Sequence, residues 1–330
     1  MRGKILQLLR DLGEGHLSGE ELSRRLSVSR TAIWKHMRAL KEEGYEIEAH
    51  ARKGYRLCQA PDRLLPEEIR NKLQTKILGQ HGIVHLDQVD STNNVAKQVA
   101  AQGCPEGLLV VAEEQTLGRG RLARGWFSPP GRGVWLSVVL RPPFAPQEAP
   151  KCTLMAAVAT ARAIRKVSGV ACGIKWPNDI LWQGRKIVGI LTEMSAEMDA
   201  INYVVIGMGI NVNIAQNDFP SELQDIGISL ATVAGHEISR VDVLQALLIE
   251  LEAVYAQVMR EGFSPLLAAW RELSVTLGEI VTVSGVKEEF VGLAQDIDED
   301  GALLVKTEKG LRRVLAGDVS IRAQKGVERK

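Results

Sequence analysis

A short stretch of the chain, GRGRLARGW at positions 118–126, combines residue types that could bind an anion. Its arginines are Arg119, Arg121 and Arg124, and arginine binds phosphoryl or carboxylate oxygens through paired hydrogen bonds. The glycines between them indicate a loop that closely approaches its ligand, and Trp126 offers a flat face for a nucleotide base. The spacing matches neither a Walker phosphate loop nor a dinucleotide fingerprint. From this stretch alone, an anion-binding loop and a solvated basic hairpin are equally good interpretations.

Further charged or amide side chains lie at predicted strand ends. Lys175–Asp179 (KWPND) places a cation, an aromatic ring, a rigid turn and a carboxylate together, and Lys186 follows across a predicted turn at Gln183–Gly184. Gly207–Asn211 (GMGIN) predicts a glycine-rich turn that ends in a polar amide. Each cluster alone is more often a turn than a site. Beside the arginine loop, they favour a binding site.

The elements that must position these residues follow from the hydrophobic periodicity between residues 81 and 273. Strand-like and helical patterns alternate there, and Ser91 or Thr92 is available to cap the first helix. Hairpins mixed with helices predict an α+β domain with a largely antiparallel or mixed sheet, not a doubly wound Rossmann fold. The predicted strands are 82–89, 106–116, 133–142, a hairpin over 173–194, and 201–214; the predicted helices are 91–103, 151–169 and 241–262.

The first sixty residues predict a winged helix-turn-helix. Ser18 can cap a helix, with Glu21 three residues later as in a capping box, and Ser29 can cap the next helix. The predicted helix-turn-helix runs from Gly19 to Arg38, and a β-hairpin wing follows with a basic tip at Arg52 and Lys53. A helical protein-interaction domain with a solvated basic face is the alternative. The outward face of the second helix would carry Arg30, Thr31, Trp34, Lys35 and Arg38.

Composition limits the class of protein. With 330 residues the chain is long enough for two or three domains, and 45% apolar with 25% charged residues is typical of a globular protein. The net charge is only +1, but residues 1–60 carry +4, as expected of an arm that binds nucleic acid. No apolar run approaches the roughly 20 residues needed to cross a bilayer, and the N-terminus does not resemble a signal peptide, so we expect a cytoplasmic location.

The cysteines indicate neither a metal site nor a disulfide framework. They are widely spaced, form no CxxC pair and have no matching histidine cluster, so we expect reduced and mostly buried thiols. They are Cys58, Cys104, Cys152 and Cys172.

Four motifs together resemble those of the bacterial biotin protein ligases, in the same order and at similar spacing. The motifs are STNN at 91–94, EEQTLGRGRLARGW at 113–126, KWPNDILWQGRKIVGILTE at 175–193 and GMGINVN at 207–213. The helix-turn-helix narrows the resemblance to the bifunctional type, a ligase and biotin operon repressor in one chain. One departure is Ala123, where some relatives have glycine; every charged position of the loop is intact.

The resemblance implies a multidomain α+β fold. A winged helix-turn-helix would occupy residues 1–62, an α+β catalytic domain with a mixed sheet residues 63–273, and a small SH3-like β-barrel residues 274–330. Arg322, in the last domain, would either extend toward the active site or be a surface arginine.

It also implies an activity. Such enzymes join biotin and Mg-ATP into biotinyl-5′-adenylate and then transfer biotin to a lysine of a biotin carboxyl carrier protein. The implied cofactor is Mg²⁺, bound through ATP, with Asp179 as the candidate protein ligand. The implied partners are biotin, ATP, the carrier protein, operator DNA and a second copy of the chain when the adenylate is bound; no membrane is implied. No covalent enzyme intermediate is needed, which agrees with the absence of a Ser/His/Asp or Cys/His arrangement.

Roles for individual residues follow from the same resemblance. Catalysis would rest on Lys186, Arg121 and Asp179. Biotin would be bound by Ser91, Thr92, Asn93, Gln115, Arg119, Gly120, Arg121 and Lys186. The nucleotide and adenylate would be bound by Arg121, Arg124, Trp126, Lys175, Asp179 and Asn211.

Two alternatives to a biotin ligase remain. A lipoate–protein ligase shares the adenylation chemistry, but it does not account for the arginine loop or the attached helix-turn-helix. A transcription factor whose ligase domain only senses a ligand is the other alternative. Every charged position of the ligase motifs is present, which argues against a degenerate enzyme.

Overall fold

The computed structural model describes residues 1–285, 289–316 and 320–323. The chain folds into two compact units, Met1–Arg63 and Leu64–Lys330. We describe each unit by itself. The finer division at residues 62/63 and 273/274 stays a prediction.

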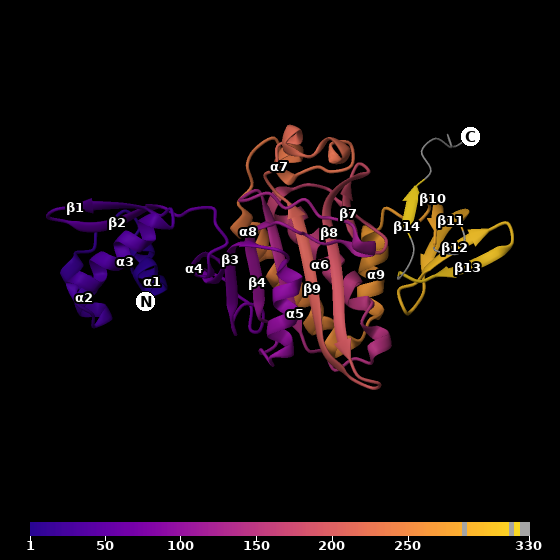
Figure 1. Ribbon diagram of the computed structural model, residues 1–330, viewed down its shortest axis with the longest axis horizontal. Coiled ribbons are helices and arrows are strands. Elements are labelled where there is room, and N and C mark those ends of the chain that lie inside the picture. The colour runs from indigo at the N-terminus through magenta and orange to yellow at the C-terminus, as the bar shows by residue number, and fades with distance from the viewer. Residues whose placement is uncertain (286–288, 317–319, 324–330) are drawn as a thin grey trace. The chain divides into compact units, whose positions relative to one another are not determined.

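The first unit consists of helices and a two-stranded hairpin (Figure 1). The predicted caps are present, because Ser18 Oγ accepts a hydrogen bond from the Glu21 N–H and Ser29 Oγ accepts one from the Ala32 N–H, both at 3.1 Å. Between these helices Ser27 has a φ of 54°, in the left-handed region, which turns the chain. The elements are α1 (Arg2–Asp11), α2 (Gly19–Leu26), α3 (Arg30–Glu42), β1 (Glu46–His50) and β2 (Gly54–Gln59).

A seven-stranded mixed sheet lies at the centre of the second unit, in the order β3-β4-β5-β9-β8-β7-β6. Strands β3 and β4 run parallel, and the remaining neighbours run antiparallel. The strands are β3 (Ile83–Val89), β4 (Leu109–Gln115), β5 (Gly133–Leu140), β6 (Gly173–Lys175), β7 (Asp179–Trp182), β8 (Arg185–Ala196) and β9 (Ile201–Asn211). The helices are α4 (Pro66–Arg70), α5 (Thr92–Ala101), α6 (Lys151–Ser168), α7 (Leu230–Ala234), α8 (Arg240–Glu261) and α9 (Ser264–Leu273), with 3-10 turns at Arg121–Ala123, Pro146–Glu148, Gln216–Asp218 and Ser221–Leu223.

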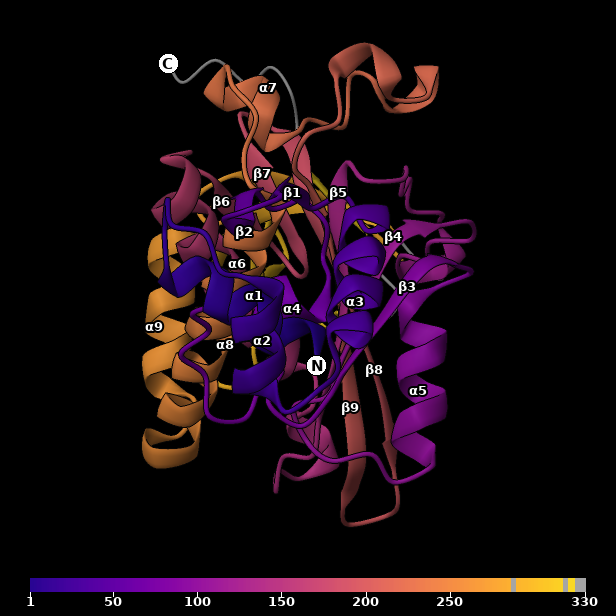
Figure 2. The same ribbon diagram turned by 90° about the vertical axis from the view of Figure 1, so that its left-hand side faces the viewer.

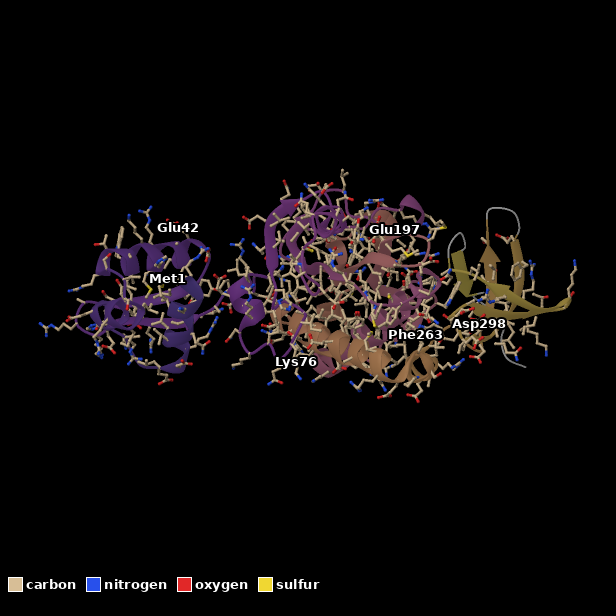
Figure 3. All side chains as sticks on the ribbon, turned by 90° about the horizontal axis from the view of Figure 1, so that it is seen from below. Met1, Glu42, Lys76, Glu197, Phe263 and Asp298 are labelled. Carbon is tan, nitrogen blue, oxygen red and sulfur yellow. The ribbon has the colours of Figure 1, made fainter. Side chains whose placement is uncertain are left out.

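Helices cover both faces of this sheet, with α5 on one face and α8 and α9 on the other (Figure 2). Alternate strand residues point to opposite faces. Val110 and Val205 pack in a small cluster with α5, while their neighbours Val111 and Val204 join the large core with α6 and α8. At the edge of that core, Lys151 Nζ lies 4.2 Å from the ring centroid of Phe263. Phe263 joins α8 to α9 in the chain and is labelled in Figure 3. The face that carries α5 also carries the candidate site described below.

The C-terminal part forms a five-stranded antiparallel sheet in the order β13-β12-β11-β10-β14. Arg322 lies on β14 opposite Thr282 on β10, but its side chain is outside the described residues. With the helix-turn-helix and the central mixed sheet, this confirms the predicted fold class. In the described residues no helix is long and apolar enough to cross a membrane. The strands are β10 (Ile280–Ser284), β11 (Glu289–Ile297), β12 (Leu303–Thr307), β13 (Gly310–Val314) and β14 (Ser320–Ala323).

A buried carboxylate, Glu113 on β4, connects several parts of the second unit. Its Oε1 accepts a hydrogen bond from the Leu64 N–H at 2.9 Å, and its Oε2 accepts one from Arg240 Nη1 on α8, also at 2.9 Å. His85 Nε2 on β3 lies 3.3 Å from Oε1. Burial by itself would raise the pKa of Glu113, but the hydrogen bond with His85 and the charge of Arg240 lower it from 4.5 to about 2.

Because this pKa is lower in the folded state, the carboxylate stabilises the fold above its unfolded pKa and loses that contribution as the pH falls. We expect wild-type protein to lose about 2 kcal/mol of unfolding free energy from Glu113 alone between about pH 5 and about pH 3. The variant Glu113→Gln should be less stable at neutral pH and should lack this part of the pH dependence. Urea unfolding of both proteins between about pH 7 and about pH 3 tests this prediction. The control is Glu197→Gln, which replaces an exposed acid. A pH dependence unchanged in Glu113→Gln would contradict the assignment.

Candidate active site and basic surface

The shortest ion pair described among the predicted site residues joins the starts of β7 and β8. Lys186 Nζ lies 2.7 Å from Asp179 Oδ1, and both side chains are mostly buried. The same Nζ lies 5.0 Å from the ring centroid of Trp126. Lys175 on β6 pairs in register with Asp179, so the cis Trp176–Pro177 turn places both residues at one strand end. The sequence prediction that KWPND and Lys186 come together is confirmed by these distances.

Gly207 and Gly209 do not form the predicted turn, and that prediction was wrong. Both glycines lie within β9, which continues to Asn211. Their importance is the space that they leave on the sheet. A Cβ on Gly209 would lie 2.2 Å from Trp126 Nε1, and a Cβ on Gly207 would lie 2.2 Å from Asn93 Oδ1. β9 keeps its pairing with both neighbouring strands through these glycines, so the close approach occurs within a continuous strand.

The positions of these glycines show how the site is laid out. Residues two apart on a strand face the same side of a sheet, so the side chains of Asn93 and Trp126 lie next to each other over β9. Gly189 on β8 extends the same surface, since a Cβ there would lie 3.0 Å from the Trp126 ring. The indole Nε1 of Trp126 is buried and has no hydrogen-bond partner among the described residues.

The arginine loop forms a narrow hairpin above this surface. The Trp126 N–H donates to the Gly118 carbonyl and the Gly120 N–H donates to the Arg124 carbonyl, both at 2.8 Å. A Cβ on Gly118 would lie 2.3 Å from the Trp126 carbonyl oxygen, so the strands of the hairpin approach this closely only with glycine at position 118.

The arginines of this loop point to different elements. Arg119 Nη1 donates to Asn94 Oδ1 on α5 at 3.0 Å. Arg121 Nη1 donates to Asn178 Oδ1 at 3.1 Å, and its Nη2 donates to the Ala316 carbonyl. Arg124 is exposed. The loop is therefore attached at one side to α5 and at the other to the start of β7.

A hydrogen-bonded network joins the start of α5 to β4 and β5. Ser91, Thr92 and Asn93 are 2%, 3% and 3% exposed. The sequence predicted that Ser91 or Thr92 would cap this helix. Ser91 is the N-cap residue, but no side-chain capping hydrogen bond forms there. Instead Gln115 Oε1 accepts the Thr92 N–H at 2.9 Å, because β4 lies directly beside the helix start. Gln115 Nε2 then donates to Ser128 Oγ at 2.9 Å.

Two residues of this network were missed from the sequence. Ser137 on β5 donates to Asn93 Oδ1 at 2.6 Å and lies 2.8 Å from Thr92 Oγ1. Glu193 on β8 accepts hydrogen bonds from Asn93 Nδ2 at 2.9 Å and from Lys97 Nζ at 2.7 Å. A polar residue inside an apolar strand was the available signal for Ser137, whereas nothing in the sequence brings Glu193 close to α5.

The pKa of Glu193 reflects these contacts. Burial raises it, but the hydrogen bonds from Lys97 and Asn93 outweigh burial and lower the pKa of the carboxyl below its ordinary value. Glu193 is thus an anion at neutral pH, and it fixes the orientation of the Asn93 amide. With Ser137 donating to the other side, Asn93 has a single favoured orientation.

Asn211 lies at the end of β9 and is 3% exposed. Its Nδ2 donates at 3.3 Å to the Lys186 carbonyl and at 3.3 Å to the Ile228 carbonyl. In this structure the amide therefore holds the backbone around Lys186. Its predicted contact with a nucleotide stays a prediction.

Together these groups suit an anionic ligand that also carries polar and aromatic parts. Arg119 and Arg121 of the arginine loop and Lys186 of β8 supply positive charge, and Trp126 supplies an aromatic face. The buried amide and hydroxyl groups at the start of α5 suit a small polar ring. Groups held in place in this way can neutralise charge that develops in a transition state without reorganising.

A second candidate surface lies on the first unit. All five residues predicted for the outward face of α3 are exposed, and Trp34 is 55% exposed despite its size. At the hairpin tip Arg52 and Lys53 are exposed, and their N–H groups both donate to His50 Nδ1 at 3.2 Å. Exposed cations beside an exposed aromatic ring are typical of nucleic-acid recognition.

Comparisons with known proteins agree with this geometry. The chain matches a model of the biotin/lipoate A/B protein ligase family at residues 85–211, an HTH domain model at residues 2–56 and a biotin protein ligase C-terminal domain model at residues 276–322. It is 44% identical to the bifunctional ligase/repressor BirA of Bacillus subtilis, over 97% of this chain and 98% of that protein. It is 32% identical to BirA of Escherichia coli, over 97% of each chain. Among solved structures, a biotin protein ligase from Aquifex aeolicus in complex with biotin and ATP matches with a TM-score of 0.65 and 28% identity, over 74% of this chain and 99% of that chain.

Proposed function

Because the chain belongs to the biotin protein ligase family and matches its bifunctional members over nearly their whole length, we propose that it is both a biotin ligase and a repressor. As a ligase it joins biotin and ATP into biotinyl-5′-adenylate and transfers biotin to a lysine of biotin carboxyl carrier protein. As a repressor it binds the operator of biotin genes in response to biotin. The observation that best supports the ligase is the layout over β9, where a polar pocket and an aromatic face meet beside Lys186.

In this proposal the start of α5 binds the ureido ring of biotin. Thr92, Asn93 and Gln115 supply hydrogen-bonding groups, and Ser91 lies buried beside them. The Gly207 position leaves room for the Asn93 amide. Arg119, attached to α5, and Gly120 then cover the bound acid from the loop side.

The reacting groups meet at the other end of this layout. The biotin carboxylate oxygen attacks the α-phosphorus of ATP and pyrophosphate leaves, so two anions must approach each other. Lys186 and Arg121 reduce that repulsion, with Arg124 near the phosphates, while Trp126 packs on adenine and Asn211 contacts the adenylate. In the second step the carrier lysine attacks the acyl carbon and AMP leaves. Covering the mixed anhydride protects it from water.

Magnesium fits this site as a companion of ATP. Mg²⁺ usually binds through one or two carboxylates together with substrate phosphates. Asp179 supplies one carboxylate beside Lys186, with Lys175 opposite in register. The described residues contain no group of three acidic, histidine or cysteine side chains that would form a metal cage. When bound, the ion would neutralise phosphate charge, and Asp179 would hold it.

A labelling assay tests the ligase and its alternatives. The full chain is incubated with ATP, a carrier domain lacking its cofactor, and either biotin or lipoate. Both acids carry a radioactive label, and we expect the carrier domain to become labelled with biotin. Label from lipoate alone would show a lipoate–protein ligase instead, and no label from either acid would favour a sensor without ligase activity.

The two glycines of β9 should separate the two halves of the site. Gly207→Ala pushes a Cβ against Asn93, so we expect biotin to bind about tenfold more weakly or worse, with ATP much less affected. Gly209→Ala pushes a Cβ against Trp126 and should weaken the binding of ATP about tenfold, with biotin binding much less affected. Calorimetric binding of each substrate to both variants checks this. Equal losses for both substrates in both variants would contradict the proposed layout.

For the repressor, we propose that α3 enters the major groove and the wing contacts phosphates. Replacing Arg52 and Lys53 by alanine should lower DNA affinity about tenfold at moderate salt and flatten the slope of affinity against salt by about two. The ligase rate should not change. Lys4→Ala, an exposed cation on α1, is the control. An unchanged salt slope in the double variant would exclude phosphate contacts from the wing.

The response to biotin would come from dimerisation. Each chain carries one helix-turn-helix, and a two-fold operator needs two, so we propose that biotinyl-adenylate favours a homodimer that binds DNA. Duplexes selected from a random library serve as the operator. Biotin with ATP should raise gel-shift affinity and the mass of the protein in solution together. A DNA affinity that does not change when biotin and ATP are added would contradict this proposal.

A further inference from the structure

Lys186, the cation proposed to act in adenylation, is held from outside its own hairpin. The segment Gln224–Ile228, here called the strap, belongs to the connection between β9 and α8, which lies at one end of the sheet and carries α7 (Figure 1). The Lys186 N–H donates to the Ile226 carbonyl at 2.6 Å, and the Lys186 carbonyl accepts the Ile228 N–H at 3.0 Å. The strap therefore supplies main-chain partners on both sides of Lys186.

The strap is in turn attached to β8 by one side chain, Arg185. Its Nη2 donates at 2.7 Å to the Gln224 carbonyl and at 2.7 Å to the Gly227 carbonyl. These two carbonyls lie near the two ends of the strap. Charged donors make the stronger hydrogen bonds in proteins, so this half-buried arginine strengthens the attachment of the strap to the start of β8. The same two carbonyls also accept hydrogen bonds from Gln216 Nε2, at 2.6 and 3.4 Å, which come from the connection itself and not from β8.

The residues leading into the strap also support Trp126. Phe219 is buried in a cluster with Trp135 and Ile214, and Trp126, Phe127 and Leu223 pack against that cluster. A Cβ on Gly227 would lie 3.0 Å from the Phe219 ring, so the strap rests directly on this cluster. Lys186, proposed to act where carboxylate and phosphate meet, and Trp126, proposed to pack on adenine, thus share one support.

From these contacts we infer that Arg185 is a positioning residue for the adenylation step. It fixes the strap, and the strap fixes the backbone of Lys186 and the packing of Trp126. The inference rests on the proposed ligase function. The hydrogen bonds of Thr92, Asn93 and Gln115 do not involve the strap. Loss of Arg185 therefore affects the adenylation centre and the nucleotide, and it spares the groups proposed to bind the ureido ring.

The test measures steady-state pyrophosphate release by the full-length chain, with the carrier domain that lacks biotin in excess and with biotin and ATP varied separately. For Arg185→Met we expect kcat to fall, because Lys186 is displaced, and the KM for ATP to rise about tenfold or more, because Trp126 loses support, while the KM for biotin stays within about twofold. Arg185→Lys should recover much of the loss, since one nitrogen serves both carbonyls. The matched control is Arg165→Met, because Arg165 also holds a backbone carbonyl, that of Cys172, through Nε at 3.0 Å and Nη2 at 2.6 Å.

Several results would overturn the inference. One is a wild-type KM for ATP in Arg185→Met. Another is an equal rise in both KM values for Arg185→Met, together with a loss of thermal stability as large as that measured for Arg165→Met. That pattern would indicate a purely structural role. A third is a lysine variant no better than the methionine variant. Failure of the proposed function is distinguishable, since the wild-type chain itself would then release no pyrophosphate with biotin.

Discussion

Replacing Lys186 by methionine is expected to slow biotinyl-adenylate formation about a thousandfold while the protein remains folded. The ammonium lies 2.7 Å from Asp179 and 5.0 Å from the Trp126 ring centroid, at the place where carboxylate and phosphate would meet. A fixed cation there stabilises the transition state more than it stabilises either bound substrate. The loss should therefore appear chiefly in kcat. Single-turnover formation of labelled adenylate at saturating biotin and ATP measures it.

The control for this prediction is another lysine in an ion pair. Lys166→Met removes an exposed lysine near Glu250 on the far side of the sheet from the site and should leave the rate unchanged. Lys186→Arg keeps the charge with a different shape and should fall between the methionine variant and wild type. A near-normal kcat in Lys186→Met would exclude a catalytic role for this residue.

Replacing Arg121 by alanine is expected to shorten the lifetime of bound biotinyl-adenylate about tenfold or more. Arg121 attaches the arginine loop to Asn178 and to the Ala316 carbonyl, so its loss frees one side of the cover over the reactive anhydride. Release of adenylate from a preloaded enzyme, followed over time, measures the effect. Arg132→Ala, which removes a half-exposed arginine just outside the loop, is the control.

Proteolysis tests the same cover independently. If the loop closes over its ligand, biotin and ATP should protect wild-type protein from proteinase K cleavage between Arg119 and Arg124. Arg121→Ala should lose most of that protection. Cleavage of wild-type protein that does not change on adding the substrates would contradict the idea of a closing loop.

Local patterns predicted much of this molecule because their physics is local. The serines at positions 18 and 29 begin helices through hydrogen bonds that span three residues. The wing and the KWPND hairpin are antiparallel strands joined by short turns, so each pairing is settled by nearby residues. Lys186 and Asp179, seven residues apart, meet because one hairpin brings them together.

The predictions that failed involve contacts between distant parts of the chain. Two glycines separated by one residue indicate a turn when only the neighbours are considered, yet β9 continues through Gly207 and Gly209. Their purpose is visible only when Asn93 and Trp126, about 80 to 115 residues earlier in the chain, are placed over them. For the same reason the start of α5 is capped by Gln115 from β4 and not by its own serine.

The amino-acid sequence by itself determined the family, the fold class and the chemical character of the site. Residue types, charges and short spacings can be read from the sequence without a structure. The arginine loop, KWPND and STNN together are specific for the biotin protein ligase family. Only the tertiary structure decided how the parts support one another. It showed that Ser137 and Glu193 orient Asn93 and that Arg185 holds the strap beside Lys186. Such contacts depend on the order and register of strands, which burial of the whole core sets and no short pattern encodes.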